Sequence, residues 1–309
     1  MHPFIHIFGL EIPSYGLMMA LAFILAIVLS YFRAKKAGKN PEIILDLAIA
    51  AIVIGLGCAY LLYIFVTYPL DKIWKSITDG SFSVFKSGGL VFYGGVIGGA
   101  LAVIGYLKLI KKQKVWDYSA IIVPTIPLAH AVGRIGCFLA GCCYGKCVDT
   151  PISVIYTNPI GGAPTGTPVF PIQLVESACN IVVFVILLLY VGRQLKRGSV
   201  LFLYMILYGI ERFVLEYFRY DEIRGIFLGL STSQWISIAM VVIGAVGLML
   251  SFKREKTMLR AAAAAPSLVN GAPAEADEAA DAGDPTEADE AADADSVETE
   301  VEGAEETAE

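Results

Sequence analysis

The sequence predicts an all-α integral membrane protein with seven transmembrane helices, the N-terminus outside, the C-terminus cytoplasmic, and a disordered acidic C-terminal tail. Three observations support this class. Hydrophobic residues make up 56% of the 309 residues and the mean hydropathy is +0.66, which is too apolar for an ordinary soluble domain. Several apolar runs approach or exceed the roughly 20 residues that a membrane-spanning helix needs. The charged residues are segregated along the chain rather than mixed.

The expected spans follow one another with short connections. Glycines and a few charges interrupt some of them, which is typical of a helix bundle with a polar interior. They cover approximately residues 14–32, 43–66, 88–110, 116–140, 172–191, 199–217 and 232–251.

The connections between these spans differ in positive charge, and this difference predicts the orientation. The first, third and fifth connections and the segment after the last span are crowded with basic residues: Arg33, Lys35, Lys36, Lys39, Lys108, Lys111, Lys112, Lys114, Arg193, Lys196, Arg197, Lys253, Arg254 and Lys256. In contrast, the long connection over residues 141–171 holds only Lys146. Because cytoplasmic loops are enriched in Lys and Arg, the N-terminus is expected outside and the 141–171 loop on the outer face.

The end of the chain has a different composition from the body. Residues 275–309 contain 16 acidic and no basic residues, which leaves 13 acidic against 23 basic residues, a net charge of +10, elsewhere. A segment with so few large apolar side chains cannot bury a core. We therefore predict a membrane domain over residues 1–260 and a disordered acidic tail over residues 261–309.

An arginine lies inside the fourth apolar run, in the stretch from Gly133 to Gly145. A charged side chain at the centre of a bilayer costs at least about 2.5–3.5 kcal/mol, so Arg134 is expected to face a cavity or a partner. Glycines at 133, 136, 141 and 145 permit close approach of another group. A fixed cation in a narrow site at membrane depth favours an anion such as a phospholipid phosphate.

A second group of charges occurs near the end of the sixth run. Arg212 and Glu216 are four residues apart and can pair on one helical face, with Tyr208 on the same stripe and Arg219 one turn beyond. Lipid would penalise this face, so it is predicted to point inward. The alternative is an ion pair that only holds helices together.

The third stretch, residues 87–99, is rich in paired glycines around Tyr93. Gly94 and Gly95 can permit a broken helix that lines a cavity, or simply a close helix-packing seam. Tyr93 could direct its hydroxyl into such a cavity, or act as an ordinary interfacial or packing residue.

Four cysteines cluster at the end of the fourth run, at positions 137, 142, 143 and 147. Their spacing is not that of a paired CxxC zinc site, and no histidine is adjacent, so packing or a disulfide is favoured over a metal. His130, one turn before Arg134, is interpreted as a packing or hydrogen-bonding residue, with a role as a base as the alternative.

Taken in order, these stretches resemble the prolipoprotein diacylglyceryl transferases over about residues 10–251. The matching segments are Tyr15-Gly16-Leu17-Met18, Gly89-Leu90-Val91-Phe92-Tyr93-Gly94-Gly95, Gly133-Arg134-Ile135-Gly136 with Gly145, Pro171-Ile172-Gln173-Leu174 with Glu176, the set Tyr208, Arg212, Glu216 and Arg219, and Gln234 with Ile236-Ser237.

The resemblance implies a multi-pass enzyme of the bacterial cell (inner) membrane in lipoprotein biosynthesis. It would move the diacylglyceryl group of phosphatidylglycerol onto the lipobox cysteine of a prolipoprotein signal peptide, without a metal or redox cofactor and without nucleic acid. The catalytic residues implied are Tyr93, Arg134, Tyr208, Arg212 and Glu216. Those implied for phosphatidylglycerol binding are Arg134, Arg212, Gly94, Gly95 and Gly145.

The chain departs from the family pattern at four positions. Tyr93 replaces a common histidine, Cys137 an asparagine, Cys142 an acidic residue and Ala59 an arginine. Two other functions fit the same residues: a non-catalytic phospholipid-binding membrane protein and a small-anion transporter. The absence of a convincing internal repeat in the sequence disfavours the transporter.

Overall fold

The computed structural model describes residues 3–7, 9–86, 88–193, 198–220 and 226–269. Two compact units are distinguished, Met1–Ala261 and Ala262–Glu309, and every contact described below belongs to the first. The expected tail falls largely on residues 270–309, outside the described residues, while the last helix continues to Val269.

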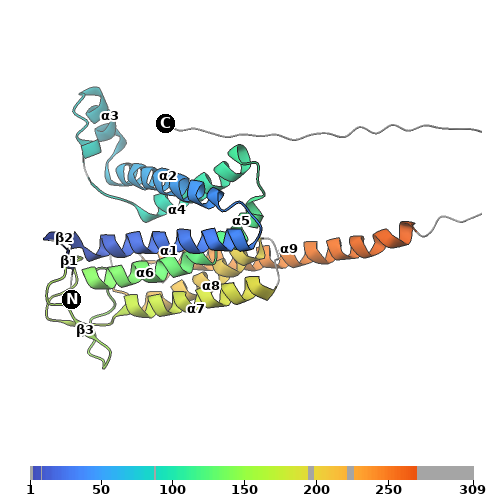
Figure 1. The fold of residues 1–309 in the computed structure, drawn as a ribbon. Coiled ribbons are helices and arrows are strands. Elements are labelled where there is room, and N and C mark those ends of the chain that lie inside the picture. Colours follow the sequence, from blue (N-terminus) through green and yellow to red (C-terminus); the bar gives the residue numbers. More distant parts are fainter. Residues whose placement is uncertain (1–2, 8, 87, 194–197, 221–225, 270–309) are drawn as a thin grey trace, which may run out of the picture. The chain divides into compact units, whose positions relative to one another are not determined.

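The described part is mostly helical, as predicted (Figure 1). Its helices are α1 (Ser14–Lys36), α2 (Glu42–Thr67), α3 (Leu70–Thr78), α4 (Phe92–Gly105), α5 (Val115–Ile122), α6 (Thr125–Ala140), α7 (Ile172–Arg193), α8 (Ser199–Leu215) and α9 (Thr232–Val269), with short π or 3₁₀ turns at η1 (Val84–Lys86), η2 (Tyr106–Ile110) and η3 (Glu216–Phe218). Among the described residues, five helices are long and apolar enough to cross a membrane, or six if the bent α5–α6 pair forms one span. These findings confirm an all-α membrane protein; α8, with 17 residues, falls just below that length.

Proline breaks the span that was predicted over residues 116–140. The axes of α5 and α6 meet at 41°, and Pro124 lies between them. Because proline has no backbone N–H and crowds the preceding turn, a helix bends or restarts at this point. The bend at Pro124 sets the direction of α6, the helix that contains Arg134.

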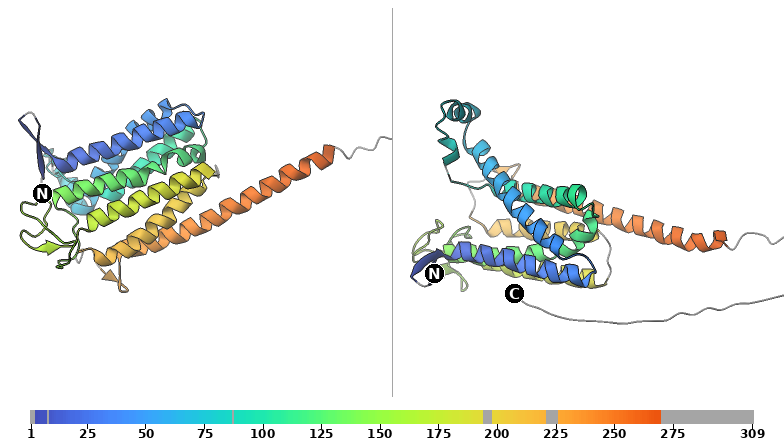
Figure 2. Two further views of the ribbon diagram at one scale, coloured as in Figure 1. Left: turned by 60° about the horizontal axis from the view of Figure 1, so that its bottom comes forward. Right: turned by 45° about the horizontal axis from the view of Figure 1, so that its top comes forward.

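Four helices form the layer that holds the arginines. α1 packs on α6, α6 on α7 and α7 on α8, side by side (Figure 2). α9 lies against α8, where Gly209 and Gly244 leave room for Val241 and Ile206, respectively. α2 and α4 pack closely on each other, and α2 also contacts α1.

Short antiparallel strands, which the sequence analysis did not anticipate, lie at the ends of helices. They pair as β1 (Phe4–Ile7) with β2 (Leu10–Pro13), β3 (Val154–Ile155) with β4 (Pro168–Val169), and β5 (Ile226–Phe227) with β6 (Leu230–Ser231). Strands of two to four residues are too short to show a period-two pattern. They cover the end of the bundle at which α6 stops and α1, α7 and α9 begin.

The 141–171 connection is an ordered structure with its own small core. Tyr156 and Val169 are fully buried there and pack with Ala163. Burial raises the pKa of Tyr156 to about 12. Its hydroxyl also accepts a hydrogen bond from Gln173 Nε2 at 3.3 Å, which joins the loop to the first turn of α7.

Candidate active site

Arg134 reaches from α6 to a buried carboxylate on the neighbouring helix. Its Nη2 lies 2.7 Å from Glu176 Oε1 on α7, and the two side chains are only 14% and 1% exposed. α1 approaches α6 closely at this level, because a Cβ on Gly136 would lie 2.9 Å from Met18 Cβ. The small residues in the Arg134 stretch therefore serve helix packing, and the arginine is buried between helices.

The second arginine also pairs as predicted. Arg212 Nη2 on α8 lies 2.6 Å from Glu216 Oε2, one turn along the chain. The same nitrogen donates to Ser233 Oγ on α9 at 3.1 Å. Nη1 of Arg212 is buried and, among the described residues, has no hydrogen-bond partner. A buried guanidinium nitrogen without an acceptor is costly, which makes this atom a natural contact for an anionic ligand.

A third arginine joins the two pairs. Arg219 Nη1 lies 3.6 Å from Glu176 Oε2, and its Nε lies 4.0 Å from Glu216 Oε2. The result is one continuous chain of charges, Arg134–Glu176–Arg219–Glu216–Arg212. Three guanidinium groups and two carboxylates alternate along this chain, and the carboxylate of Glu211, which accepts a hydrogen bond from Asn180 Nδ2 at 2.6 Å, lies near it.

Gly145 fixes the position of Arg219. It forms an isolated β-bridge with Arg219, and its N–H donates to Phe170 O at 3.1 Å. A Cβ at this position would lie 2.7 Å from Phe170 O and 2.8 Å from Phe218 O. Only glycine allows the 141–171 loop to lie this close to the end of α8.

His130 and Tyr208 border the network. Arg134 Nε donates to His130 Nε2 at 3.3 Å, and the same nitrogen lies 3.5 Å from Glu176 Oε1. The His130 ring lies against the Tyr208 ring, with centroids 5.6 Å apart. His130 therefore has a packing and hydrogen-bonding environment, as the sequence analysis favoured.

Glu176 has a more central position than its sequence motif indicates. It entered only as part of a weak motif, yet it joins Arg134 to Arg219 and is 1% exposed. The signal was present, because an acidic residue inside the apolar run 172–191 needs a buried partner. What the sequence did not show was which arginine faces it.

The first turn of α4, a helix that packs mainly on α2, holds Tyr93, Gly94 and Gly95. A Cβ on Gly94 would lie 2.5 Å from Cys58 O of α2, whereas one on Gly95 would meet nothing closer than 3.6 Å. Gly94 is thus required by the α2–α4 packing seam. Tyr93 is 48% exposed, and within the described residues its contact is a ring contact with Phe92.

Three of the clustered cysteines converge beside Arg134. The Sγ atoms of Cys137, Cys142 and Cys143 all lie within 4.8 Å of one another, and Cys147 is exposed. Hydrogen bonds from the other two thiols, and then the positive charges of Arg134 and Arg219, hold the pKa of Cys143 well below its usual range.

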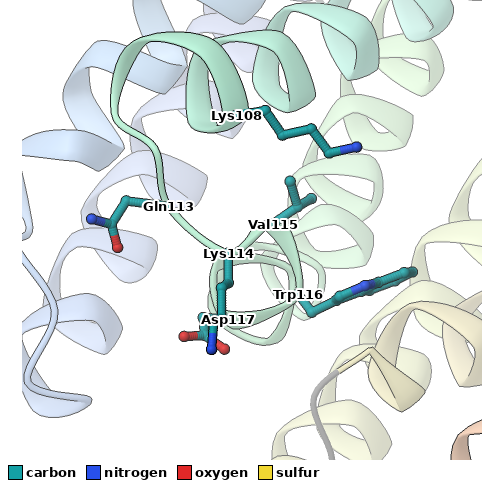
Figure 3. Close-up of a pocket in the computed structure, with 6 residues that line it drawn as sticks. All are labelled: Lys108, Gln113, Lys114, Val115, Trp116 and Asp117. Carbon is teal, nitrogen blue, oxygen red and sulfur yellow. The ribbon is translucent and has the colours of Figure 1, made fainter.

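A hollow of ≈ 290 Å³ lies elsewhere, where η2 meets α5 (Figure 3). Its lining residues are Lys108, Gln113, Lys114, Val115, Trp116 and Asp117. Asp117 Oδ2 lies 2.8 Å from Lys39 Nζ, so the carboxylate in this lining is already paired with a cation. This hollow does not coincide with the buried arginines.

The family model for prolipoprotein diacylglyceryl transferase matches residues 3–250 of the chain. The chain belongs to the prolipoprotein diacylglyceryl transferase family. It is 41% identical over 243 residues to the phosphatidylglycerol–prolipoprotein diacylglyceryl transferase of Clostridium tetani, covering 77% of this chain and 92% of that protein. A second transferase, number 2 of Clostridium perfringens, is 36% identical over 240 residues, covering 77% and 90%.

A more distant relative with the same name, from Leifsonia xyli, is 31% identical and covers 79% of this chain and 76% of that protein. The resemblance noted from sequence motifs is confirmed, and the chain is a transferase enzyme.

Proposed function

We propose that this enzyme transfers the diacylglyceryl group of phosphatidylglycerol to the lipobox cysteine thiol of prolipoproteins and releases glycerol phosphate. The observation that carries the proposal is the buried arginine network, in which Arg212 Nη1 has no hydrogen-bond partner among the described residues. A lipid phosphate supplies the acceptor oxygens and the negative charge that such a site favours.

In this proposal the substrate phosphate is bound by Arg134 and Arg212. The acceptor thiolate attacks the terminal glyceryl carbon, the carbon–oxygen bond to the phosphate breaks, and the electron pair leaves on glycerol phosphate. Fixed guanidinium groups stabilise the charge that grows on this leaving group. Glu216 orients Arg212 through their 2.6 Å contact, and Glu176 does the same for Arg134 at 2.7 Å.

The remaining predicted site residues take supporting positions. Tyr208 lies beside His130 and would hydrogen-bond to the substrate next to the same network. Gly145 sets the Arg219 backbone. Tyr93 occupies the position of the family histidine and would contact the acceptor thiol, while Gly94 and Gly95 admit the lipid alongside α4 or act through packing.

The test is transfer to a lipobox peptide by purified enzyme in vesicles that contain phosphatidylglycerol. Arg212→Lys keeps a positive charge but loses the planar fork. We expect transfer to fall about 10²–10³-fold, the usual cost of losing a group that stabilises a developing oxyanion. Arg33→Lys is the matched control, because Arg33 is a half-buried arginine that donates to the carbonyls of Ala120 and Ile121, away from the network.

The product decides between the transferase and a phospholipid-binding protein. The wild-type enzyme should release glycerol phosphate in step with peptide lipidation. Retention of intact phosphatidylglycerol, with no glycerol phosphate formed, would contradict the transferase proposal.

We also propose that α8 is a seventh span and that the 141–171 loop faces outward in a bacterial cell membrane. A helix of 17 residues is about 25 Å long, which is at the short end of spanning helices. In intact cells, a membrane-impermeant thiol reagent should label the exposed Cys147, whereas a cysteine introduced as Lys112→Cys should react only after lysis. The reverse labelling pattern would invert the topology.

A further inference from the structure

The cluster formed by Cys137, Cys142 and Cys143 has the dimensions of a thiolate metal site. Zinc–sulfur bonds of about 2.3 Å in tetrahedral geometry place sulfur atoms about 3.8 Å apart. The three Sγ atoms already lie within 4.8 Å of one another, and all three cysteines are free thiols. Side-chain adjustments of less than about 1 Å would bring them to a common ion.

The backbone holds these residues in a specific turn. α6 ends in a left-handed Gly141 (φ 74°), and the N–H of Cys142 donates to Cys137 O at 3.1 Å. Cys143 follows at φ 55°, a conformation that costs a residue with a side chain about 1–3 kcal/mol. The chain therefore reverses direction at the end of α6 and keeps the three thiols together.

Two further contacts fix the middle residue. Gln173 Nε2 donates to Cys142 O at 2.8 Å. Gly161 lies so close that a Cβ there would be 2.5 Å from Cys142 Cβ. The turn is thus packed from both sides, which is the pre-organisation that a ligand set needs.

The surroundings match the charge of such a complex. Zn²⁺ with three thiolates carries a net charge of −1, and Arg134 lies one helical turn before Cys137. The positive charges of Arg134 and Arg219, which act on Cys143, would therefore balance the metal complex, and the complex would lie next to the proposed phosphate-binding Arg134.

We propose that Cys137, Cys142 and Cys143 bind Zn²⁺ and that the fourth coordination position receives the acceptor thiol of the prolipoprotein. Three protein ligands with one open position are the usual arrangement of catalytic zinc. The second half of this proposal rests on the proposed transferase function.

Binding to zinc would solve a chemical problem that the sequence posed. A phenol in the place of a histidine is a weak base for a thiol, because the ordinary pKa values of the two groups are about 10 and 8.5. A thiol that coordinates zinc loses its proton outright, here to water. The zinc-bound thiolate then attacks the glyceryl carbon, the carbon–oxygen bond breaks toward the phosphate, and the thioether product, a weaker ligand than a thiolate, leaves the metal.

The metal site is tested on the purified full chain, reduced and stripped of metal, by titration with Cd²⁺ as a spectroscopic probe of thiolate coordination. We expect one Cd²⁺ per chain, displaced by Zn²⁺. Loss of a ligand should cost more than the 10–100-fold typical of changes beyond the ligands, so Cys137→Ser, Cys142→Ser and Cys143→Ser should each weaken binding by at least about 100-fold. Cys147→Ser and Cys179→Ser are the matched controls and should bind as the wild type does.

Three results would overturn the site: no thiolate–cadmium band in the wild type, equal binding by the serine variants, or a disulfide between any two of the three cysteines in the purified protein. None of them depends on transfer activity.

The catalytic role is tested by comparing transfer before and after zinc is restored to the wild type, which avoids substitutions that disturb folding. Removal of the metal should lower transfer at least about tenfold, and Zn²⁺ should restore it, because ionising the nucleophile is commonly worth 10²–10⁴-fold. Equal rates with and without metal would overturn the role of zinc and leave the proposed function intact. No transfer by zinc-loaded enzyme would instead contradict the proposed function, while the Cd²⁺ titration still decides the site.

Discussion

Glu176 is the residue on which the geometry of the buried network depends most. Its two carboxylate oxygens face two different arginines, Arg134 at 2.7 Å and Arg219 at 3.6 Å, and its side chain is 1% exposed. The substitution Glu176→Gln keeps the shape of the side chain and removes its charge. It removes the carboxylate charge that both Arg134 and Arg219 face, while Glu216 still faces Arg219 and Arg212.

The expected cost follows from this burial. Removing one partner of a buried ion pair typically costs about 3–5 kcal/mol, because the other charge stays buried without compensation. At about 2–4 °C per kcal/mol for a domain of 150–250 residues, the melting temperature should fall by about 6–20 °C. The partly exposed pair Lys111–Asp46, at 2.9 Å with side chains 35% and 37% exposed, provides the contrast, and an asparagine at 46 can still accept the hydrogen bond from Tyr106. Asp46→Asn should cost no more than about 1 kcal/mol.

Thermal unfolding in one detergent, with lipid transfer measured in parallel, tests this prediction. In a double-mutant cycle with Arg134→Met, the two changes should be non-additive by about 0.5–3 kcal/mol, since the residues are in direct contact. A Glu176→Gln melting temperature within the range of Asp46→Asn, or strict additivity with Arg134→Met, would show that Glu176 does not hold the network together.

Three further predictions concern residues in the proposed site. Gly94→Ala should destabilise the protein by about 1–3 kcal/mol through overpacking, whereas Gly95→Ala should be tolerated. If both variants lost transfer equally and neither lost stability, contact with the lipid at both positions would be favoured instead. Gly145→Ala should lower transfer at least about tenfold by displacing Arg219, while Gly57→Ala, with open space around it, should stabilise α2 by about 0.5–1 kcal/mol in thermal unfolding. Tyr93→Phe should leave the melting temperature unchanged, because no described residue forms a hydrogen bond with the Tyr93 hydroxyl. The same change should reduce transfer if Tyr93 contacts the acceptor thiol as proposed. An unchanged transfer rate would remove Tyr93 from the site.

The sequence alone predicts the membrane class, the helical content and the Arg212–Glu216 pair. The first two depend on composition and run length, and the third on the four-residue spacing within one helix. Motif order was also sufficient to indicate the family. Each of these properties is local in the chain, so a single sequence contains it.

The contacts between helices could not be predicted from the sequence in the same way. That Glu176 lies between Arg134 and Arg219 depends on how α6, α7 and the end of α8 pack, and a lone carboxylate in an apolar run does not identify its partner. Likewise, four cysteines at irregular spacing gave no metal pattern, yet the left-handed turn at Gly141 and Cys143 brings three of them together. Buried charge must be compensated wherever it occurs, but which groups compensate it is a property of the packed structure.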